Sequence, residues 1–248
     1  YALNNLAISV GSVMGNYALA SQYYEEAYKI AKELGDRYSQ GIALGNLGFA
    51  AGMQGNITAA YLHHEHSLLV AREIGNKNQE TYTLINLSAV AGLQKEAAQA
   101  LQFAKQAEEL SRKIHDRSAE AWSMLYMGHA YLLMEKYTEA QKNYLKSFGI
   151  RNELAQLALS MEPLAGLVET ALHMNDFEAA SRETEKILAY MEHGGSLDGT
   201  EEPLRVYYAC YQLLSKQKDP RAQQVLQIAN QLLEAQVSKF KDERARKL

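Results

Sequence analysis

The sequence predicts an all-α fold in which about six helix pairs stack one after another as an α-solenoid. Apolar residues recur at helical spacing through most of the chain, as in LNNLAISVGSVM (3–14). The chain also repeats itself with a period of 40 residues, since a small residue returns in the same column of successive segments. That column holds Ala20, Ala60, Ala100, Ala140 and Ala180. Stacked repeats of this length bury a continuous core that no single repeat could bury alone.

Short breaks at intervals of 20 residues divide each repeat into two helices. A glycine followed by Asn or Asp marks each break, because glycine suits the left-handed position just after a helix and Asn or Asp caps the next helix. These breaks are Gly15-Asn16, Gly35-Asp36, Gly55-Asn56 and Gly75-Asn76. The first helix of each pair is expected near residues 1–14, 41–54, 81–94, 121–134 and 161–174, with the second helix beginning about three residues later.

The domain organisation expected from this pattern has three parts. Five helix pairs occupy residues 1–192, and HGGSLDGT (193–200) forms a loop with clear turn chemistry. A sixth pair occupies residues 201–248, with its first helix beginning near Glu202 and its second near Pro220. The second helix of this pair is long and ends highly charged, as expected of a capping helix with one solvated side. Because the chain begins inside a repeat, we expect it to be a piece of a longer protein.

Composition and charge exclude several classes of function. The net charge is −4 at pH 7 and no basic stripe is interleaved with aromatic residues, so binding to nucleic acid or to an anionic membrane is not expected. The single cysteine, Cys210, excludes an intramolecular disulfide and suits a reducing compartment, which makes the cytoplasm the expected location. The sequence has no apolar run of 18 residues and no signal peptide.

Catalytic motifs are missing from the sequence. It contains no phosphate-binding loop, dinucleotide fingerprint, nucleophile elbow or H-E-x-x-H pattern, so neither enzymatic activity nor a cofactor is expected. The run His63-His64-Glu65-His66 invites a metal interpretation, but two imidazoles without a thiolate or carboxylate from elsewhere make a poor site. Metal binding is therefore not expected.

Several columns of the repeat resemble the tetratricopeptide repeat, whose signature places a small residue at position 8 and pairs a small residue at position 20 with a ring at position 24. The matching residues are Leu47-Gly48, Met127-Gly128-His129-Ala130-Tyr131, Ala20 with Tyr24, and Ala140 with Tyr144. Small residues allow the two helices of a pair to approach closely, while the ring fills the gap to the neighbouring pair. The sequence departs from the signature where His64, Ala104 and Thr184 replace the ring and where Val168 replaces the small glycine.

The period of 40 is similar to the longer-helix variety of this repeat, as in kinesin light chains and in bacterial signalling proteins that join such repeats to an ATPase or cyclase. The phrases LGNLG, ELGDR, EIGNK and DERARKL are most similar to the bacterial group. This resemblance implies a right-handed superhelix whose concave surface is lined by the first helix of every pair.

The resemblance also implies which side chains point into the concave groove. The expected partner-binding residues are Asn5, Asn46, Phe49, Asn86, Trp122, Tyr126, His129, Glu169 and His173, with Met53, Tyr82, Leu93, Leu133 and Glu162 in the same columns. A ladder of asparagines offers donors and acceptors to an extended peptide backbone, and the aromatic residues offer apolar contact area. The alternative is that the asparagines bond neighbouring helices. Similarly, Glu169 and His173 are expected to be a polar pair that lines the groove and not an acid–base pair.

We therefore expect a non-catalytic interaction scaffold that binds a protein or peptide segment in its groove, as part of a larger bacterial signalling protein. The alternative is a sensor module of a signalling ATPase or transcriptional regulator, in which Trp122, Tyr126 and His129 form a compact pocket for a small effector. The sequence leaves the oligomeric state and the identity of the partner open.

Overall fold

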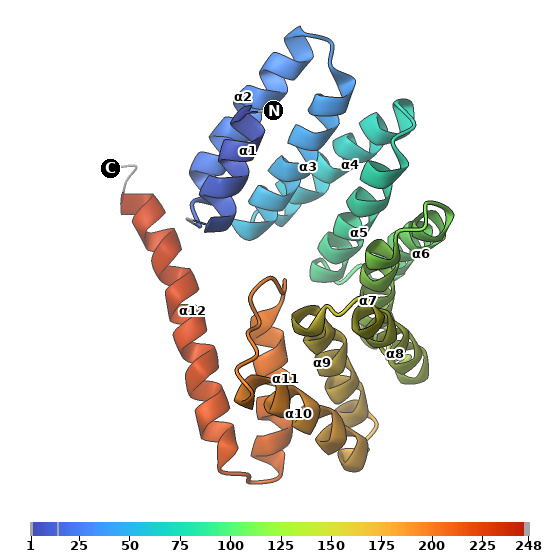
Figure 1. The fold of residues 1–248 in the computed structure, drawn as a ribbon, viewed down its shortest axis with the longest axis vertical. Helices are drawn as coiled ribbons and strands as arrows, with labels where there is room; N and C mark the ends of the chain where they lie inside the picture. The colour runs from blue at the N-terminus through green and yellow to red at the C-terminus, as the bar shows by residue number, and fades with distance from the viewer. Residues whose placement is uncertain (1, 14, 246–248) are drawn as a thin grey trace. The chain divides into compact units, whose positions relative to one another are not determined.

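The computed structural model describes residues 2–13 and 15–245, and these residues form helices and no strands (Figure 1). The elements are α1 (Ala2–Ile8), the π-helix η1 (Ser9–Val13), α2 (Tyr17–Glu33), α3 (Arg37–Met53), α4 (Ile57–Glu73), α5 (Lys77–Leu93), α6 (Ala97–Lys113), α7 (Arg117–Leu133), α8 (Tyr137–Glu153), α9 (Leu157–His173), α10 (Phe177–Glu192), α11 (Pro203–Lys216) and α12 (Arg221–Ala245). The predicted all-α architecture of consecutive helix pairs is confirmed.

The chain divides into two compact units. The first unit comprises Tyr1–Ala119 together with Ser238–Leu248, and the second comprises Glu120–Val237. In the first unit each helix from α1 to α6 packs against the next along the chain, and in the second unit the same holds from α8 to α11. This consecutive packing is that of a solenoid of helix pairs, in which each repeat contacts its neighbours.

The boundaries of the first helices differ from the prediction. Helices α3, α5, α7 and α9 begin at residues 37, 77, 117 and 157, four residues before the predicted starts. The cause is the capping residue, because Asp36 already accepts a hydrogen bond of 3.0 Å from the backbone N–H of Ser39 and so starts the helix directly after the break. The predicted single helix over 1–14 is divided into α1 and η1, and residue 14 lies outside the described residues.

The capping chemistry expected at the breaks is present. Asn or Asp side chains accept a hydrogen bond from the backbone N–H three residues later at Asn16, Asp36, Asn56, Asn76, Asp116 and Asp176. The residue before each break is left-handed, with φ between 54° and 76°, at Gly15, Gly35, Gly55, Gly75, Lys95, His115, Glu135, Ala155 and Asn175. The 20-residue punctuation therefore continues through the chain even where glycine has been replaced.

Packing of small residues against rings follows the predicted columns. The five alanines of the repeated column are each no more than 2% exposed. A Cβ atom built on Gly128 would lie 2.5 Å from the Tyr144 ring, and one on Gly166 would meet the same ring at 2.5 Å. The Tyr144 ring therefore fills the space between its own helix pair and the next one. At Gly48 the corresponding neighbour is the His64 ring, at 2.6 Å, so His64 does take the place of the ring.

The sixth helix pair has a different register from the others. Helix α11 begins at Pro203 with Glu202 as its N-cap, and Lys218 is the left-handed residue that follows it. Lys218 corresponds to Gly55 with a shift of three residues from the 40-residue period. The segment before α11 is irregular, and its Leu197 is buried in the apolar core of the second unit. In the part of the chain that the structure describes, no helix is long and apolar enough to cross a membrane.

Candidate functional site: an open groove and a closed polar cluster

An open groove of about 790 Å³ runs along the first unit, lined mainly by α3 and α5. We call it the α3–α5 groove. Its lining residues are Tyr38, Gly41, Ile42, Gly45, Asn46, Phe49, Ser67, Ile74, Asn76, Asn78, Gln79, Tyr82, Thr83 and Asn86. Four residues from the predicted groove columns therefore line one cavity, namely Asn46, Phe49, Tyr82 and Asn86.

The floor of the α3–α5 groove depends on two glycines of α3. A Cβ atom on Gly41 would lie 2.3 Å from the Gln79 amide nitrogen, and one on Gly45 would lie 3.3 Å from the Ser67 hydroxyl. Ser67 donates a hydrogen bond of 2.9 Å to the carbonyl of Gly41 and accepts one of 3.2 Å from Gln79. The polar groups of the floor are thus bonded to one another, and the glycines leave space above them.

The asparagines predicted to form a ladder have different surroundings. Asn46 donates a hydrogen bond of 3.0 Å from Nδ2 to Oδ1 of Asn4, so Asn46 joins α3 to α1 as the interhelix alternative proposed. The predicted ladder residue Asn5 is exposed and does not line the groove, because the π-helical turn η1 changes the register of the residues before it. Asn86 lines the groove, and no described residue forms a hydrogen bond with its amide.

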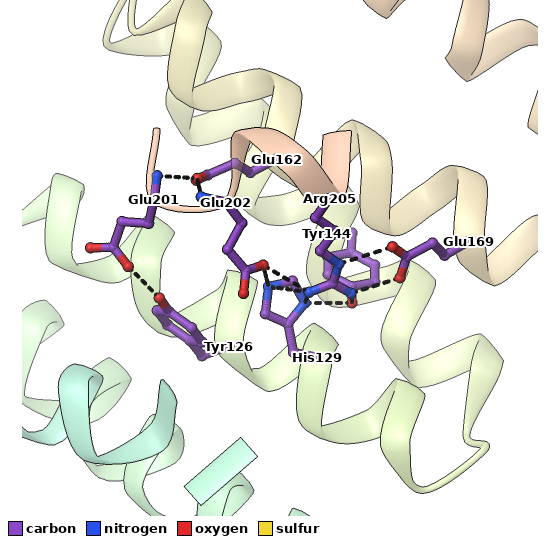
Figure 2. A network of polar contacts seen from close by, with 8 residues as sticks. All are labelled: Tyr126, His129, Tyr144, Glu162, Glu169, Glu201, Glu202 and Arg205. Atoms are coloured by element: carbon purple, nitrogen blue, oxygen red, sulfur yellow. Dashed lines mark hydrogen bonds and ion pairs between the residues drawn. The ribbon is translucent and has the colours of Figure 1, made fainter. Parts of the chain in front are cut away.

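Groove-column residues of the second unit are covered by the chain itself. Figure 2 shows Arg205, at the start of α11, between Glu169 of α9 and His129 of α7. Its guanidinium donates two hydrogen bonds to Glu169, Nε to Oε1 at 2.9 Å and Nη2 to Oε2 at 2.7 Å. Nη1 donates to Glu202 at 3.0 Å and lies 2.9 Å from both ring nitrogens of His129.

His129 is compatible with this cation because its ring is held neutral. Burial, and secondarily the charge of Arg205, lowers the pKa of His129 well below its ordinary value. A hydrogen bond of 2.7 Å joins Nδ1 of His129 to the Tyr144 hydroxyl. Predicted groove residue His129 therefore contributes to a buried network and is not available to a partner in this structure.

Glu162 fixes the backbone that leads into α11. Its Oε1 accepts hydrogen bonds from the backbone N–H groups of Glu201 at 2.6 Å and Glu202 at 3.0 Å, while Oε2 has no hydrogen-bond partner among the described residues (Figure 2). Burial is the main reason that the pKa of Glu162 is raised to about 7, and the carboxylates of Glu201 and Glu202 add to it. Tyr126 donates a hydrogen bond to the carboxylate of Glu201, so this predicted groove residue is also covered.

The remaining predicted residues of the second unit have aromatic partners. Trp122 stacks on Tyr126 with ring centroids 6.2 Å apart, and the guanidinium of Arg151 lies 4.4 Å from the Trp122 ring centroid. His173 is exposed and stacks on Tyr137 at 5.3 Å. Glu169 bonds Arg205, so Glu169 and His173 do not form the polar pair that their spacing suggested.

The titratable groups of both sites have structural partners. Among the described residues, no group of three or more His, Cys, Asp or Glu side chains is arranged to hold a metal ion. His64 is buried, and burial lowers its pKa to about 4. The arrangement therefore supports binding through the α3–α5 groove, while the polar cluster holds the second unit together.

Sequence reasoning missed Arg205, Glu201 and Glu202. The expected start near Glu202 was almost correct, but counting from the preceding pairs gave no groove column for Arg205. Counting back from Lys218 with the three-residue shift places Arg205 in the column of Tyr82, Trp122 and Glu162. The long loop before α11 was the available signal that the register had changed.

Comparison with known proteins agrees with the repeat. Residues 39–113 match the family model of the tetratricopeptide repeat. No curated protein sequence matches the chain. Repeats of this family imply a scaffold for protein–protein interaction, and their fold is in general non-catalytic.

Solved structures share the fold at low sequence identity. A Rap protein complexed with competence and sporulation factor has a TM-score of 0.70 and 13% identity, over 98% of this chain and 70% of that chain. A signal transduction ATPase with numerous domains and a tetratricopeptide repeat sensor, from Pyrococcus horikoshii, has a TM-score of 0.68 and 14% identity, over 97% of this chain and 38% of that chain. BtubC (BKLC) from P. vanneervenii has a TM-score of 0.67 and 16% identity, over 89% of this chain and 90% of that chain. Residues 39–113 therefore belong to the tetratricopeptide repeat family, and the helix pairs on either side of them share its fold.

Proposed function

We propose that the chain is a non-catalytic scaffold that binds an extended protein segment in the α3–α5 groove. The observation that carries this proposal is the groove itself, about 790 Å³ in volume, in which exposed rings stand beside an amide without a protein partner. Phe49 is 46% exposed and Tyr82 is 41% exposed, which is unusual for large apolar side chains on one surface. An extended peptide would cover these rings and pair its backbone with the amide of Asn86.

The cellular context that we propose is a cytoplasmic module of a larger bacterial signalling protein. Support comes from the similarity to the ATPase with a tetratricopeptide repeat sensor, of which this chain spans 38%. The structure of the Rap protein complexed with its factor adds that a solenoid of this fold can hold a ligand. In the sensor alternative a small effector would enter between Trp122, Tyr126 and His129, but Glu201 and Arg205 of the same chain already bond Tyr126 and contact His129.

The test is selection of peptides from a random display library on the immobilised chain, followed by affinity measurement with groove variants. Phe49→Ala and Asn86→Ala are expected to weaken the selected peptides at least tenfold, because buried aromatic contacts and backbone hydrogen bonds are lost. The matched controls are Leu69→Ala and Asn152→Ala, which change exposed helical residues outside the groove. Failure to select any peptide, or equal loss in the controls, would refute the proposed function.

A thermal-shift screen with sugars, nucleotides and short peptides separates the scaffold from the sensor. The scaffold predicts that the selected peptides raise the melting temperature in proportion to their concentration. A sugar or nucleotide that did so in their place would favour the sensor.

A further inference from the structure

The lining of the α3–α5 groove contains no ionisable side chain other than tyrosine. Its polar side chains are amides and hydroxyls, and its apolar ones are aromatic or aliphatic. A charged side chain of a guest would lose hydration on entering such a groove and would find no opposite charge there. The groove therefore disfavours charge of either sign.

Charged residues at the ends of the groove are paired with one another. Arg37, next to the lining residue Tyr38, forms an ion pair with Glu73, next to Ile74. Glu80 lies between Gln79 and the groove residue Tyr82 in sequence and is buried. Its two carboxylate oxygens accept from Arg72 at 2.9 Å and from Lys77 at 2.8 Å.

Asp116 is the acidic group that reaches a lining residue directly. Its Oδ2 accepts a hydrogen bond of 3.0 Å from the Tyr82 hydroxyl, and its Oδ1 accepts one of 2.9 Å from the backbone N–H of Ala119. Asp116 therefore anchors one groove ring and caps α7, where a negative charge is favoured by the helix N-terminus. Its carboxylate already has a partner on each oxygen.

Hydrophobic anchors are available on both helices. The Tyr38 and Phe49 side chains on α3 are each 46% exposed, and Tyr82 on α5 is 41% exposed. Between them lie the amides of Asn78 and Asn86, which form no hydrogen bond with any described residue. Rings with free amides beside them fit a guest that inserts an apolar side chain and presents its backbone to the amides.

We propose that the guest of the α3–α5 groove is an uncharged extended peptide whose anchor is an aromatic or aliphatic side chain. This inference rests on the proposed function and adds the chemistry of the partner to it. Specificity comes from the neutrality of the lining, because Asp, Glu, Lys or Arg at the anchor position is excluded by its desolvation.

The experiment uses the peptides selected on the full chain, with affinity measured by fluorescence anisotropy at low and high salt. Raising the salt from about 50 to about 500 mM is expected to change Kd less than twofold, since screening affects only interactions between charges. Replacing the anchor residue of a selected peptide by Asp or by Lys is expected to weaken binding at least tenfold in both cases. A selected consensus that is acidic or basic, or a tenfold loss of affinity in high salt, would overturn the inference and leave the proposed function standing.

A charge placed in the groove provides the matched reversal. Asn86→Asp keeps the size of the side chain, and selection on this variant is expected to yield peptides that carry Lys or Arg and bind in a salt-dependent way. The control Asn152→Asp changes an exposed residue of α8 and should select the same neutral peptides as the unmodified chain. Circular dichroism checks that both variants keep their helicity. Selection of no peptide on any of these chains would refute the proposed function, and this inference with it.

Discussion

Arg205 and Glu169 form a two-pronged ion pair, with both N–H···O distances below 3 Å, although the residues lie 36 positions apart in the chain. The pair joins the start of α11 to α9 and lies next to His129 and Tyr144 (Figure 2). Side-chain exposure is 24% for Arg205 and 16% for Glu169, so water screens the pair only partly. This contact holds the irregular segment before α11 against the groove columns of the second unit.

Glu169→Gln is expected to destabilise the chain by about 2 kcal/mol, because a hydrogen-bonded charge is removed and the partly buried guanidinium loses its main counter-charge. Urea denaturation followed by circular dichroism measures this loss. The matched control is Glu185→Gln on α10, since Glu185 forms a similar pair with Arg221 but is 56% exposed. The control is expected to lose less than about 0.5 kcal/mol. Equal losses in the two variants would show that burial does not strengthen the Arg205 pair.

Glu162 has the opposite effect on stability at neutral pH. Its pKa is raised from 4.5 to about 7, chiefly by burial, so the folded chain binds a proton more tightly than the unfolded chain. The stabilisation from that proton is fully present below pH 4.5 and is lost as the pH rises through 7. Glu162→Gln keeps an oxygen acceptor for the two backbone N–H groups and removes the buried charge. We expect this variant to be more stable than the unmodified chain above pH 7, by up to about 3 kcal/mol.

The difference in unfolding free energy between the two chains should be largest above pH 7 and should vanish toward pH 4.5. Measuring it as a difference cancels the titration of other groups. Glu183→Gln is the control, because Glu183 is also buried but its carboxylate pairs with Arg182 and Lys186. That substitution should destabilise. A Glu162→Gln variant with the same pH profile as the unmodified chain would contradict the assignment of the buried charge.

The helix pairs could be predicted from the sequence because their packing leaves little freedom of residue size. The alanine column is buried at every repeat, and a Cβ on Gly128 would collide with the Tyr144 ring. Such positions keep small residues and therefore show the period directly. The family model covers only 39–113, whereas the alanine column extends to Ala180.

The candidate site could be predicted only where the register held. Asn46, Phe49 and Asn86 line the α3–α5 groove in the expected columns. At the start of the chain the π-helix η1 brings Asn4 and not Asn5 beside Asn46. In the sixth pair the three-residue shift brings Arg205 onto Glu169. Both differences come from local changes in helix geometry that leave no regular sequence pattern.

Left-handed residues without glycine give the last prediction. Ala155 has φ 54° and Asn175 has φ 58°, each at the position that glycine holds in the first three helix breaks. This conformation places the Cβ of an ordinary L-residue against the following carbonyl, at a cost of roughly 1–2 kcal/mol, while asparagine tolerates it better. Glycine removes the strain but gains entropy in the unfolded chain, which offsets part of the benefit. Ala155→Gly is therefore expected to raise the free energy of unfolding by about 0.5–1 kcal/mol, and Asn175→Gly by clearly less. Gly35→Ala, at φ 68° with open space around its Cβ position, is the reverse control and should lose about 1 kcal/mol. Urea denaturation of the three variants ranks them, and a gain for Asn175→Gly as large as that for Ala155→Gly would show that backbone strain does not determine the order.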